Sequence, residues 1–313
     1  MSYSLERNQL LLFKVEDTSG SDATPTKDAN AINCASIEWG IDPETLQQIE
    51  INRYLDDPEV ILGRKLVPFT VKCSLKGSGT AGTAPQLAAF FKCCAFKETI
   101  TALTSCVYNC SSVETDHKTG TAYIYDTGRL IKVVGCMGNV SNVNNAGQQG
   151  LVTLSMQGKF LSQEDASLPA SPTFESTTAP IVQSAGITFG AWANAVVRSL
   201  SFSSGNKIGE RRDCNSVDGV LGMFIGGRDT TFQALVESVN EATKPFIGNM
   251  LSGTKEQISE TIGATAGNIV TITAVKCKTN KVDVQRQEGI NLLNLTGQCR
   301  ADSGDDNLVF SFT

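Results

Sequence analysis

The feature that most constrains the fold of this chain is a short stretch that occurs twice. Residues 143–158 read VNNAGQQGLVTLSMQG, and residues 282–297 read VDVQRQEGINLLNLTG. Val, Gln, Leu and Gly recur at matching places, with Gly150 and Gly289 separated by 139 residues (289 − 150). A glycine turn followed by alternating apolar and polar residues is typical of a β-hairpin. The sequence therefore predicts that one hairpin was duplicated within the chain; the alternative is two unrelated hairpins that share turn glycines.

The repeated stretch also predicts which side of the returning strand faces the core, because side chains alternate along a strand. One set of positions is mostly apolar and is predicted to face the core: Val152, Leu154 and Met156, matched by Asn291, Leu293 and Leu295. The alternate set is mostly polar and is predicted to meet water or a neighbouring subunit: Thr153, Ser155 and Gln157, matched by Leu292, Asn294 and Thr296.

The same alternation recurs along the chain, in segments rich in Val, Ile, Thr and aromatic residues and bounded by Gly, Asn and Asp. The predicted strands are 67–75, 121–126, 129–136, 151–160, 196–202, 220–226, 268–277, 290–297 and 307–313. Helical patterns are fewer. We expect a helix within 84–96, short helices within 243–253 and 254–263, and at most one helical turn at 42–49.

The helix within 84–96 has the clearest pattern. It begins near Pro85, which suits the first turn of a helix, and it places Leu87, Phe90, Phe91 and Cys94 on one face. A Pro245-led segment occupies the corresponding place in the second half, as Phe232 corresponds to Phe69 in the preceding strand. The predicted fold class is therefore mainly β, with two tandem β-sandwich or barrel-like domains that each have a flanking short helix.

The length of 313 residues is consistent with two domains, since domains usually contain about 100–200 residues. The segment SQEDASLPASPTFESTTAP, residues 162–180, is rich in proline and small polar residues and is typical of a linker. The predicted organisation is an N-terminal arm at 1–29, a first domain at 30–161, a linker at 162–180 and a second domain at 181–313.

The charge of the chain argues against tight binding to nucleic acid. The formal net charge is −6, whereas binding to phosphates needs clustered Lys and Arg. Like charge would instead suit a surface along which nucleic acid slides without sticking. We find no secretory signal pattern at the N-terminus and no apolar stretch near the length of about 20 residues that spans a bilayer. The sequence therefore predicts folding in a cytoplasm and no membrane partner.

The ten cysteines do not show a metal-binding spacing. None forms a CxxC pair, and Cys106 and Cys110 come nearest without a second pair at the usual spacing. Most lie in apolar segments, where a free thiol behaves as a small hydrophobic side chain. We predict reduced buried thiols; disulfides and a metal site are the alternatives. The cysteines are Cys34, Cys73, Cys93, Cys94, Cys106, Cys110, Cys136, Cys214, Cys277 and Cys299.

The sequence offers no convincing catalytic, cofactor-binding or metal-binding residue. His117 is the single histidine and lies in a polar segment, where we expect an exposed loop. The glycine-rich segment 77–82 lacks the terminal Gly-Lys-Ser/Thr of a phosphate-binding loop, and we expect a flexible loop there. The segment 301–307 predicts a turn, with a cation site as the alternative.

Two charged groups complete the search for a site. The acidic run is predicted to be a solvated loop, with paired carboxylates as the alternative; its members are Glu50, Asp56, Asp57 and Glu59. The basic pair Arg211 and Arg212 stands without the interleaved aromatic residues of a platform that binds single-stranded nucleic acid. The lack of a site favours a structural or assembly protein over an enzyme.

A tandem β protein must also protect its exposed strand edges, and closing into a ring is one solution. Four segments then carry a resemblance to a known family: LVPFTVKCSLKG (66–77), APQLAAFFKCCAF (84–96), GQQGLVTLSMQGKF (147–160) and RQEGINLLNLTGQC (286–299). The chain resembles the tail tube proteins of long-tailed, siphovirus-type bacteriophages, in the form with two tandem tube domains. The resemblance covers most of 30–160 and, more loosely, 181–313.

The resemblance implies a structural virion protein that self-assembles into stacked rings, the tail tube through which DNA is ejected. It implies homotrimeric rings with pseudo-sixfold symmetry around a tape-measure protein, contacts with tail terminator and tail-tip proteins, and assembly in the bacterial cytoplasm. An acidic protein would give a negative lumen that repels phosphate. The alternatives are another tail or injection-machine ring, such as a terminator, connector or baseplate hub, a carbohydrate-binding or surface-binding β module, and an enzyme dependent on His117.

Overall fold

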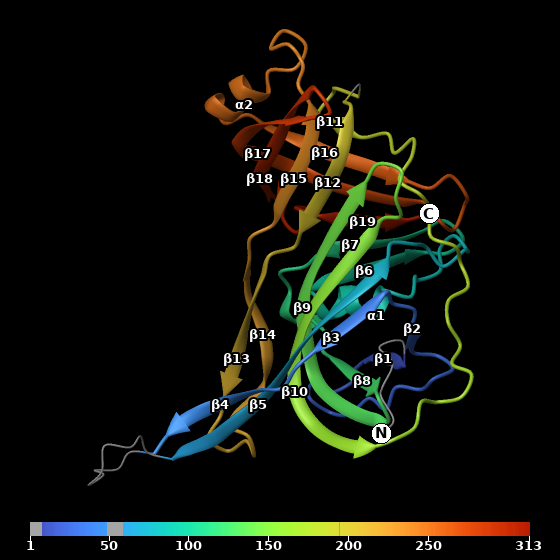
Figure 1. Cartoon of the computed structure of the whole chain (residues 1–313), viewed down its shortest axis with the longest axis vertical. Helices are drawn as coiled ribbons and strands as arrows, with labels where there is room; N and C mark the ends of the chain where they lie inside the picture. Colours follow the sequence, from blue (N-terminus) through green and yellow to red (C-terminus); the bar gives the residue numbers. More distant parts are fainter. Residues whose placement is uncertain (1–7, 49–58, 194) are drawn as a thin grey trace.

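The computed structural model describes residues 8–48, 59–193 and 195–313. Its described part is mainly β, with large antiparallel sheets and two α-helices, which confirms the predicted fold class at that level (Figure 1). Helix α1 spans Ala88–Cys93, α2 spans Phe246–Ser252, and a 3-10 helix occupies Glu114–Asp116.

Four strands of the first half form an antiparallel sheet in the order β3-β5-β10-β9. Their bounds are Ser36–Trp39 for β3, Val60–Ser74 for β5, Leu151–Asp165 for β10 and Arg129–Asn145 for β9. Apolar side chains alternate with polar ones along these strands, so one face of the sheet can be buried. In β10, Val152, Leu154 and Met156 are buried while Thr153 and Ser155 reach solvent, which confirms the predicted faces.

Four strands of the second half repeat this order as β12-β15-β18-β17. Their bounds are Val197–Ser203 for β12, Thr231–Glu237 for β15, Ile290–Arg300 for β18 and Val270–Gln287 for β17. In both halves the chain leaves the second strand of the sheet for a helix and returns through a long hairpin, β9–β10 or β17–β18. The halves thus share a strand order and a connectivity in addition to the repeated hairpin.

The two half-sheets are joined edge to edge. Strand β12 pairs with the end of β9, with Ser203 opposite Ser141 and Ser199 opposite Asn145. One continuous run of eight strands results, in the order β3-β5-β10-β9-β12-β15-β18-β17. Figure 1 shows the upper part of β9 passing into the second half beside β12.

Shorter strands cover and extend this sheet. Strand β8 pairs with β9 and β1, while β16 and β19 pair with β17. Strand β19 also pairs with β7 of the first half, which gives the halves a second strand contact. The bounds are Gln9–Val15 for β1, Ala31–Ile32 for β2, Phe96–Thr101 for β6, Ser105–Cys110 for β7, Gly120–Asp126 for β8, Thr188–Phe189 for β11, Lys255–Ile262 for β16 and Val309–Phe312 for β19.

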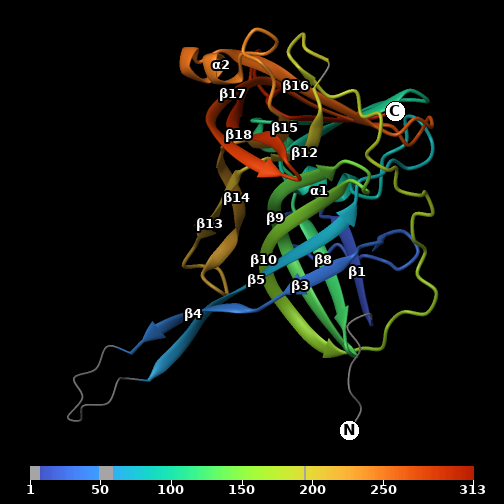
Figure 2. The ribbon, with the colours of Figure 1, turned by 45° about the horizontal axis from the view of Figure 1, so that its top comes forward.

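Two arms project from the sheet, each inserted at the same point of its half. In the first half β4 (Asp42–Gln47) pairs with the beginning of β5, and in the second half β13 (Asn206–Arg212) pairs with β14 (Val220–Arg228). Figures 1 and 2 show both arms extending from the same side of the molecule. The insertion lies between the first and second strands of each half-sheet, so the shared connectivity includes the arms.

The core is continuous between the two halves. Phe91 of α1 stacks on Tyr108 with ring centroids 4.8 Å apart, and it contacts Phe310 of β19 at 5.0 Å. Phe90 stacks on Phe13 of β1 at 3.9 Å. The predicted apolar face of α1 is therefore confirmed, and burial of several aromatic side chains gives this helix most of its stability. The predicted N-terminal arm contributes β1 to the sheet and Phe13 to the core.

Two of the predicted helical segments are strands. Residues 254–263 contain β16, in which Ile258, Glu260 and Ile262 alternate inward, and this period of two is that of a strand. Residues 42–47 form β4, which pairs with β5 in the arm. An isolated helical turn has little stability of its own, whereas pairing with an existing strand satisfies the backbone. The predicted helix at 243–253 is confirmed as α2.

The predicted linker begins later than expected. Strand β10 continues to Asp165 because its final residues pair with the beginning of β9. The following residues have no regular secondary structure, yet they are attached to the first half. The Lys76 ammonium donates hydrogen bonds to the carbonyl oxygens of Glu175 and Thr177, each at 2.9 Å, and Lys27 donates to the carbonyl of Ala170 at 2.7 Å.

Both long hairpins contain a β-bulge at the same place. In the first hairpin the register shifts between Gln157 and Lys159, around Gly158. In the second hairpin it shifts between Thr279 and Lys281, beside Gly297. Bulges combined with a glycine mark a close approach of backbone and are specific features of a strand pair. The returning strands β10 and β18 therefore match in structure at the offset that the sequence predicts.

The outgoing strands match at a different offset. Val143 lies opposite Leu151, and the residue opposite Ile290, the counterpart of Leu151, is Gln287. Val143 therefore corresponds to Gln287, an offset of 144 residues (287 − 143), and the sequence alignment of the outgoing strands was wrong. The cause is the turn, because 288–289 form a two-residue turn with both residues at positive φ, whereas the first hairpin has a longer loop.

Two further details of the hairpin prediction need correction. Leu292 occupies a position predicted to be polar and exposed, yet it is fully buried, while Asn291, predicted to face the core, is exposed. Of the two turn glycines, Gly289 has a φ of +81°, which favours glycine, but Gly150 does not have positive φ. In the first hairpin the left-handed position is Gly147, with a φ of +76°.

Candidate functional site

Both halves contribute to the solvent side of the eight-stranded sheet, which we call the polar sheet face. Its side chains are hydroxyl and amide groups from six adjacent strands, all partly or fully exposed. They are Thr70, Asn139, Ser141, Thr153, Ser155, Gln157, Ser199, Ser201, Ser203, Gln233, Asn294 and Thr296. The registers place these residues on one side because each lies opposite another member of the set or continues its alternation.

The polar sheet face has charged side chains at its margins. In the first half Lys72 and Glu38 form an ion pair at 3.6 Å. In the second half Lys281 and Asp283 pair at 2.6 Å. These two pairs add no net charge, and the registers also place Lys278, opposite Gln298, and Glu237, opposite Leu292, on this side.

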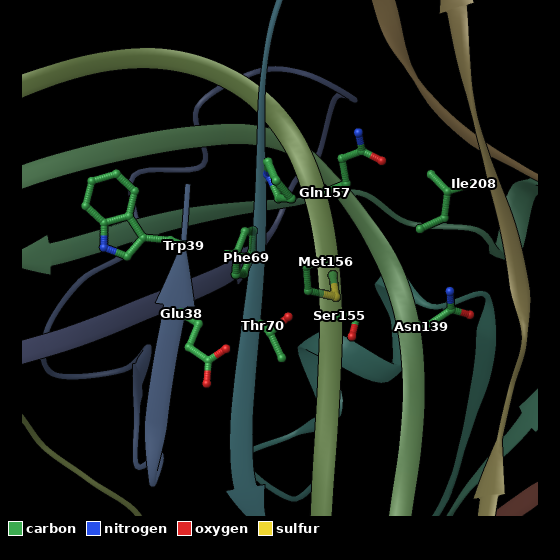
Figure 3. Close-up of a pocket in the computed structure, with 10 residues that line it drawn as sticks. Glu38, Trp39, Phe69, Thr70, Asn139, Ser155, Met156, Gln157 and Ile208 are labelled. Carbon is green, nitrogen blue, oxygen red and sulfur yellow. The ribbon is translucent and has the colours of Figure 1, made fainter. Parts of the chain in front are cut away.

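A shallow hollow lies on the first half of this face. Figure 3 shows Glu38, Thr70, Ser155 and Asn139 projecting from the adjacent strands β3, β5, β10 and β9, with Ile208 of β13 at the far side. One carboxylate among hydroxyl and amide groups lacks the paired acid and base that hydrolysis needs. The hollow is a surface of the sheet without the convergence of polar groups typical of an active site.

The two outer edges of the eight-stranded sheet differ from its interior. Strand β3 pairs with β5 on one side, and none of the described strands pairs with its other side. Strand β17 pairs with β16 and β19 over its first part, but from Thr279 to Gln287 it pairs only with β18 among the described strands. Unpaired backbone groups at such an edge are a template for another strand.

The arms are held together by an ion cluster. The Nε of Arg64 in β5 lies 2.9 Å from Oε2 of Glu210 in β13 and 3.3 Å from Oε2 of Glu44 in β4. Arg212 extends the cluster, at 3.1 Å from Glu44 and 3.6 Å from Glu210. The basic pair singled out in the sequence is therefore partly neutralised, because Arg212 binds carboxylates between the arms.

His117 is half-buried after the 3-10 helix rather than fully exposed as predicted. Its Nε2 lies 2.9 Å from the carbonyl oxygen of Ser111. The hydroxyl of Ser111 donates instead to Asp116, at 2.8 Å. A catalytic serine would donate to the histidine, so these three residues form a turn and do not have the geometry of a triad.

The glycine-rich segment 77–82 is a loop, as predicted, but it is packed against the second half. The Gly79 amide donates to the carbonyl of Gly267 at 3.0 Å, and the Gly77 amide donates to Oδ1 of Asn268 at 2.9 Å. A Cβ on Gly77 would lie 2.2 Å from the Gly267 carbonyl oxygen. Glycine is needed here for close approach of two backbones, and the amides are occupied by protein acceptors.

The other acidic segments do not converge on a site. In the turn at 301–307, the carboxylate of Asp306 accepts hydrogen bonds from the amides of Asp302 and Ser303 at 2.8 and 3.0 Å, as in a turn. Of the acidic run, Glu59 is exposed. Its other members, Glu50, Asp56 and Asp57, lie outside the described residues. Among the described residues, no group of three or more His, Cys, Asp or Glu side chains could hold a metal ion.

The cysteines are free thiols, and most are buried as predicted, with Cys34 partly and Cys214 fully exposed as the exceptions. Burial raises the pKa of Cys34 and of Cys110 to about 11 in each case. Cys277 and Cys299 lie opposite each other in β17 and β18, with their sulfur atoms 3.2 Å apart. The raised pKa values keep buried thiols protonated near neutral pH and therefore unreactive.

One functional candidate was not found in the sequence. The Glu260 side chain of β16 is fully buried, and Nδ2 of Asn144 in β9 donates a hydrogen bond to its Oε1. Burial raises the pKa of this carboxyl to about 8, and the hydrogen bond from Asn144 lowers it in part. The contact joins the two halves beside the β9–β12 junction. The sequence does contain a signal for it, because Glu260 lies two residues from both Ile258 and Ile262 and therefore shares their inward face in a strand. The segment was predicted to be a helix, in which Glu260 would not share a face with the two isoleucines.

No family model matches the chain, and no curated protein matches it. No helix among the described residues is both long and apolar enough to cross a membrane. The function must therefore be argued from the sheet, its edges and its polar face.

Proposed function

We propose that this protein is a structural subunit that self-assembles into stacked rings and forms the tail tube of a bacteriophage. The observation that carries the proposal is the eight-stranded sheet, made of two half-sheets of equal strand order that are joined edge to edge. We infer that the half-sheets belong to two tandem copies of one domain. Three such chains would supply six equivalent half-sheets, and closed symmetry is the usual outcome of self-association.

The polar sheet face suits the wall of a DNA conduit. Binding to nucleic acid depends on cationic side chains that displace counterions from phosphates, and Lys72 and Lys281 beside this face are held in ion pairs. Hydroxyl and amide side chains keep the face hydrated without attracting phosphate. The twelve polar side chains of the face are uncharged, in contrast to the negative lumen expected from the sequence.

The two arms provide contacts along the axis of such an assembly. They project from the sheet and are held together by Arg64 and Arg212 with Glu44 and Glu210 (Figure 2). Paired arms that extend beyond the sheet could reach an adjacent ring, whereas a flat ring surface would offer less area for stacking. In this proposal the lumen surrounds a tape-measure protein during assembly, and the protein resides in the virion.

Electron microscopy of the purified protein tests the proposal directly. Negative staining and light scattering over a range of concentrations should reveal rings or hollow tubes. Closed rings that never stack would favour a terminator, connector or baseplate ring over a tube. A monodisperse monomer at high protein concentration would contradict both assignments, because the sheet edges would then have no partner.

A further inference from the structure

The junction between the half-sheets serves as a template for a junction between chains. We propose that the end of β17 pairs antiparallel with residues 40–42 and the beginning of β4 in a second copy of this chain, as β9 pairs with β12 inside the chain. The inference rests on the ring-forming function proposed above and specifies which strands close the ring.

The strand registers identify the counterpart of β12 in the first half. Ser203 of β12 lies opposite Thr231 in β15, and Asp42 lies opposite Leu66 in β5. Thr231 and Leu66 are equivalent because they face residues of β18 and β10 that match at the offset of 139. Asp42 is therefore the counterpart of Ser203, and the edge formed by β3 and the beginning of β4 is the counterpart of β12.

The counterpart of the β9 edge follows in the same way. Ser141 of β9 lies opposite Thr153 in β10, and Gln285 of β17 lies opposite Leu292 in β18. Thr153 and Leu292 are equivalent at the offset of 139, so Gln285 is the counterpart of Ser141. Within the chain Ser203 lies opposite Ser141. Between chains, Asp42 of one copy should therefore lie opposite Gln285 of the next.

At both open edges an apolar side chain is exposed, whereas its counterpart in the internal junction is buried. Val140, beside Ser141, is fully buried at 0% exposure, whereas its counterpart Val284 is 65% exposed. Phe202, beside Ser203, is 2% exposed, whereas its counterpart Ile41 is 41% exposed. These apolar residues lie on the core side of their strands, so the single chain leaves on each edge an apolar position that the internal junction covers. Mutual pairing would bring Ile41 and Val284 to neighbouring positions on that side.

The backbone of β17 is directed to accept a strand. Because 288–289 form a two-residue turn, Gln287 and Ile290 are a hydrogen-bonded pair, and the alternation places the N–H of Arg286 on the side away from β18. In the internal junction the corresponding side of β9 is used, since the Ser204 amide donates to the Val140 carbonyl at 2.9 Å. The counterpart of Ser204 is Pro43, which has no N–H, so between chains the amides that remain are those of Ile41 and of Arg286 opposite it, together with that of Val284.

The charges of the two edges favour a second copy of the same chain as the occupant. The β3–β4 edge carries three carboxylates, of which Glu38 pairs with Lys72 and Glu44 with Arg64 and Arg212, while Asp42 is the one expected opposite Gln285. The end of β17 and its approach carry three cations and one carboxylate: Lys278, Lys281, Arg286 and Asp283. Opposite net charge would steer the two edges together, and salt would weaken that attraction.

Disulfide trapping tests the pairing and its register. Chains with Asp42→Cys are mixed with chains with Gln285→Cys, both with Cys214→Ser to remove the exposed native thiol. Opposite residues of antiparallel strands lie within the reach of a disulfide. We expect covalent dimers after mild oxidation of the mixture and none from either variant alone. The double variant should give covalent species up to the number of chains in the ring.

The internal junction provides the matched control. Ser141→Cys combined with Ser203→Cys in one chain should form an intrachain disulfide under the same conditions, which validates the trapping method. Gln285→Cys mixed with Asp165→Cys, at the far end of β10, should give no dimer. Dimers from that mixture would show random collision and overturn the assignment.

A proline substitution tests the edge independently of cysteine chemistry. Arg286→Pro removes the N–H directed to the neighbouring chain and leaves the β17–β18 hydrogen bonds in place, whereas Arg286→Ala keeps that N–H. We expect rings with Arg286→Ala and monomers with Arg286→Pro, both variants having the melting temperature of the parent monomer. Rings that form normally with Arg286→Pro and without Asp42–Gln285 trapping would overturn this inference and leave the ring-forming function standing. Absence of rings from the parent protein would overturn both.

Discussion

The two long hairpins, β9–β10 and β17–β18, occupy the same place in the strand order of their halves and share a bulge with a glycine. The ends of their outgoing strands have different neighbours. The end of β9 is covered by β12 and buries Val140, whereas the end of β17 leaves Val284 65% exposed. The returning strands have a similar sequence pattern and Val140 and Val284 are the same residue type, so the difference in exposure arises from what lies beside them. The comparison teaches that the same hairpin can have its outer strand edge paired in one copy and unpaired in the other. The unpaired edge indicates where a partner could bind.

The largest expected effect tests the glycines at the shared bulge. A Cβ on Gly297 would lie 2.1 Å from the Lys278 carbonyl oxygen, and a Cβ on Gly158 would lie 2.7 Å from Sγ of Cys136. Gly297→Ala should therefore destabilise the chain by about 3 kcal/mol or more and Gly158→Ala by less, because a side chain yields more easily than backbone. Urea unfolding measures both. Equal, small effects would show that the bulges are not close approaches and would break the comparison.

The next effect concerns Glu260, which joins the halves through Asn144. The pKa of about 8 in the folded state exceeds the ordinary value of 4.5, so the folded state binds the proton more tightly. Stability should be complete below about pH 4.5 and decline by a few kcal/mol as the pH rises through 8. Glu260→Gln should remove this decline in melting temperature between pH 5 and 8. Glu237→Gln, on the exposed side of β15, is the control, and a decline that persists in Glu260→Gln would refute the assignment.

A smaller effect compares the two equivalent valines directly. Val140→Ala deletes buried methyl groups and should cost about 2 kcal/mol of unfolding free energy. Val284→Ala should change the stability of the single chain by less than about 0.5 kcal/mol, because its side chain is exposed. Thermal unfolding at low protein concentration separates the two. A large loss from Val284→Ala in the monomer would mean that the end of β17 is already covered, which would remove the main difference between the hairpins.

The smallest effect concerns the turns, where the hairpins differ in length. Gly289 has a φ of +81°, so Gly289→Ala should cost about 1 kcal/mol and Gly289→Asn less, since asparagine tolerates this conformation. Gly147, at +76° in the longer loop of the first hairpin, should show the same order. Chemical denaturation of the four variants measures these differences. If the asparagine and alanine variants lost the same unfolding free energy at either turn, the explanation by positive φ would be contradicted.

Much of the fold could be predicted from local patterns. The alternation along β10 identified Val152 and Leu154 as core, and the helical face of Phe90 and Phe91 identified α1. These predictions succeeded because burial on one side imposes a period of two on a strand and a longer period on a helix. Residues 254–263 failed because polar residues between Ile258 and Ile262 fit either period over so short a segment.

The candidate site was less predictable than the fold. Twelve polar side chains from distant parts of the sequence form one face because the registers of six strands align them. Register depends on turn length and on the neighbouring strand, and the longer loop of the first hairpin shifted the outgoing strands by five residues relative to the sequence match. The buried state of Glu260 likewise required the second half to pack against Asn144.

The sequence by itself determined that the chain is mainly β, that it contains a repeated hairpin, and where the alternating faces of the returning strands lie. It could do so because side-chain periodicity and turn residues act over a few neighbouring positions. Only the tertiary structure decided that the half-sheets join through β9 and β12, that β17 ends with an open edge, and that Val140 is buried while Val284 is not. Pairing and burial depend on strands brought together from distant parts of the chain, which no local pattern specifies.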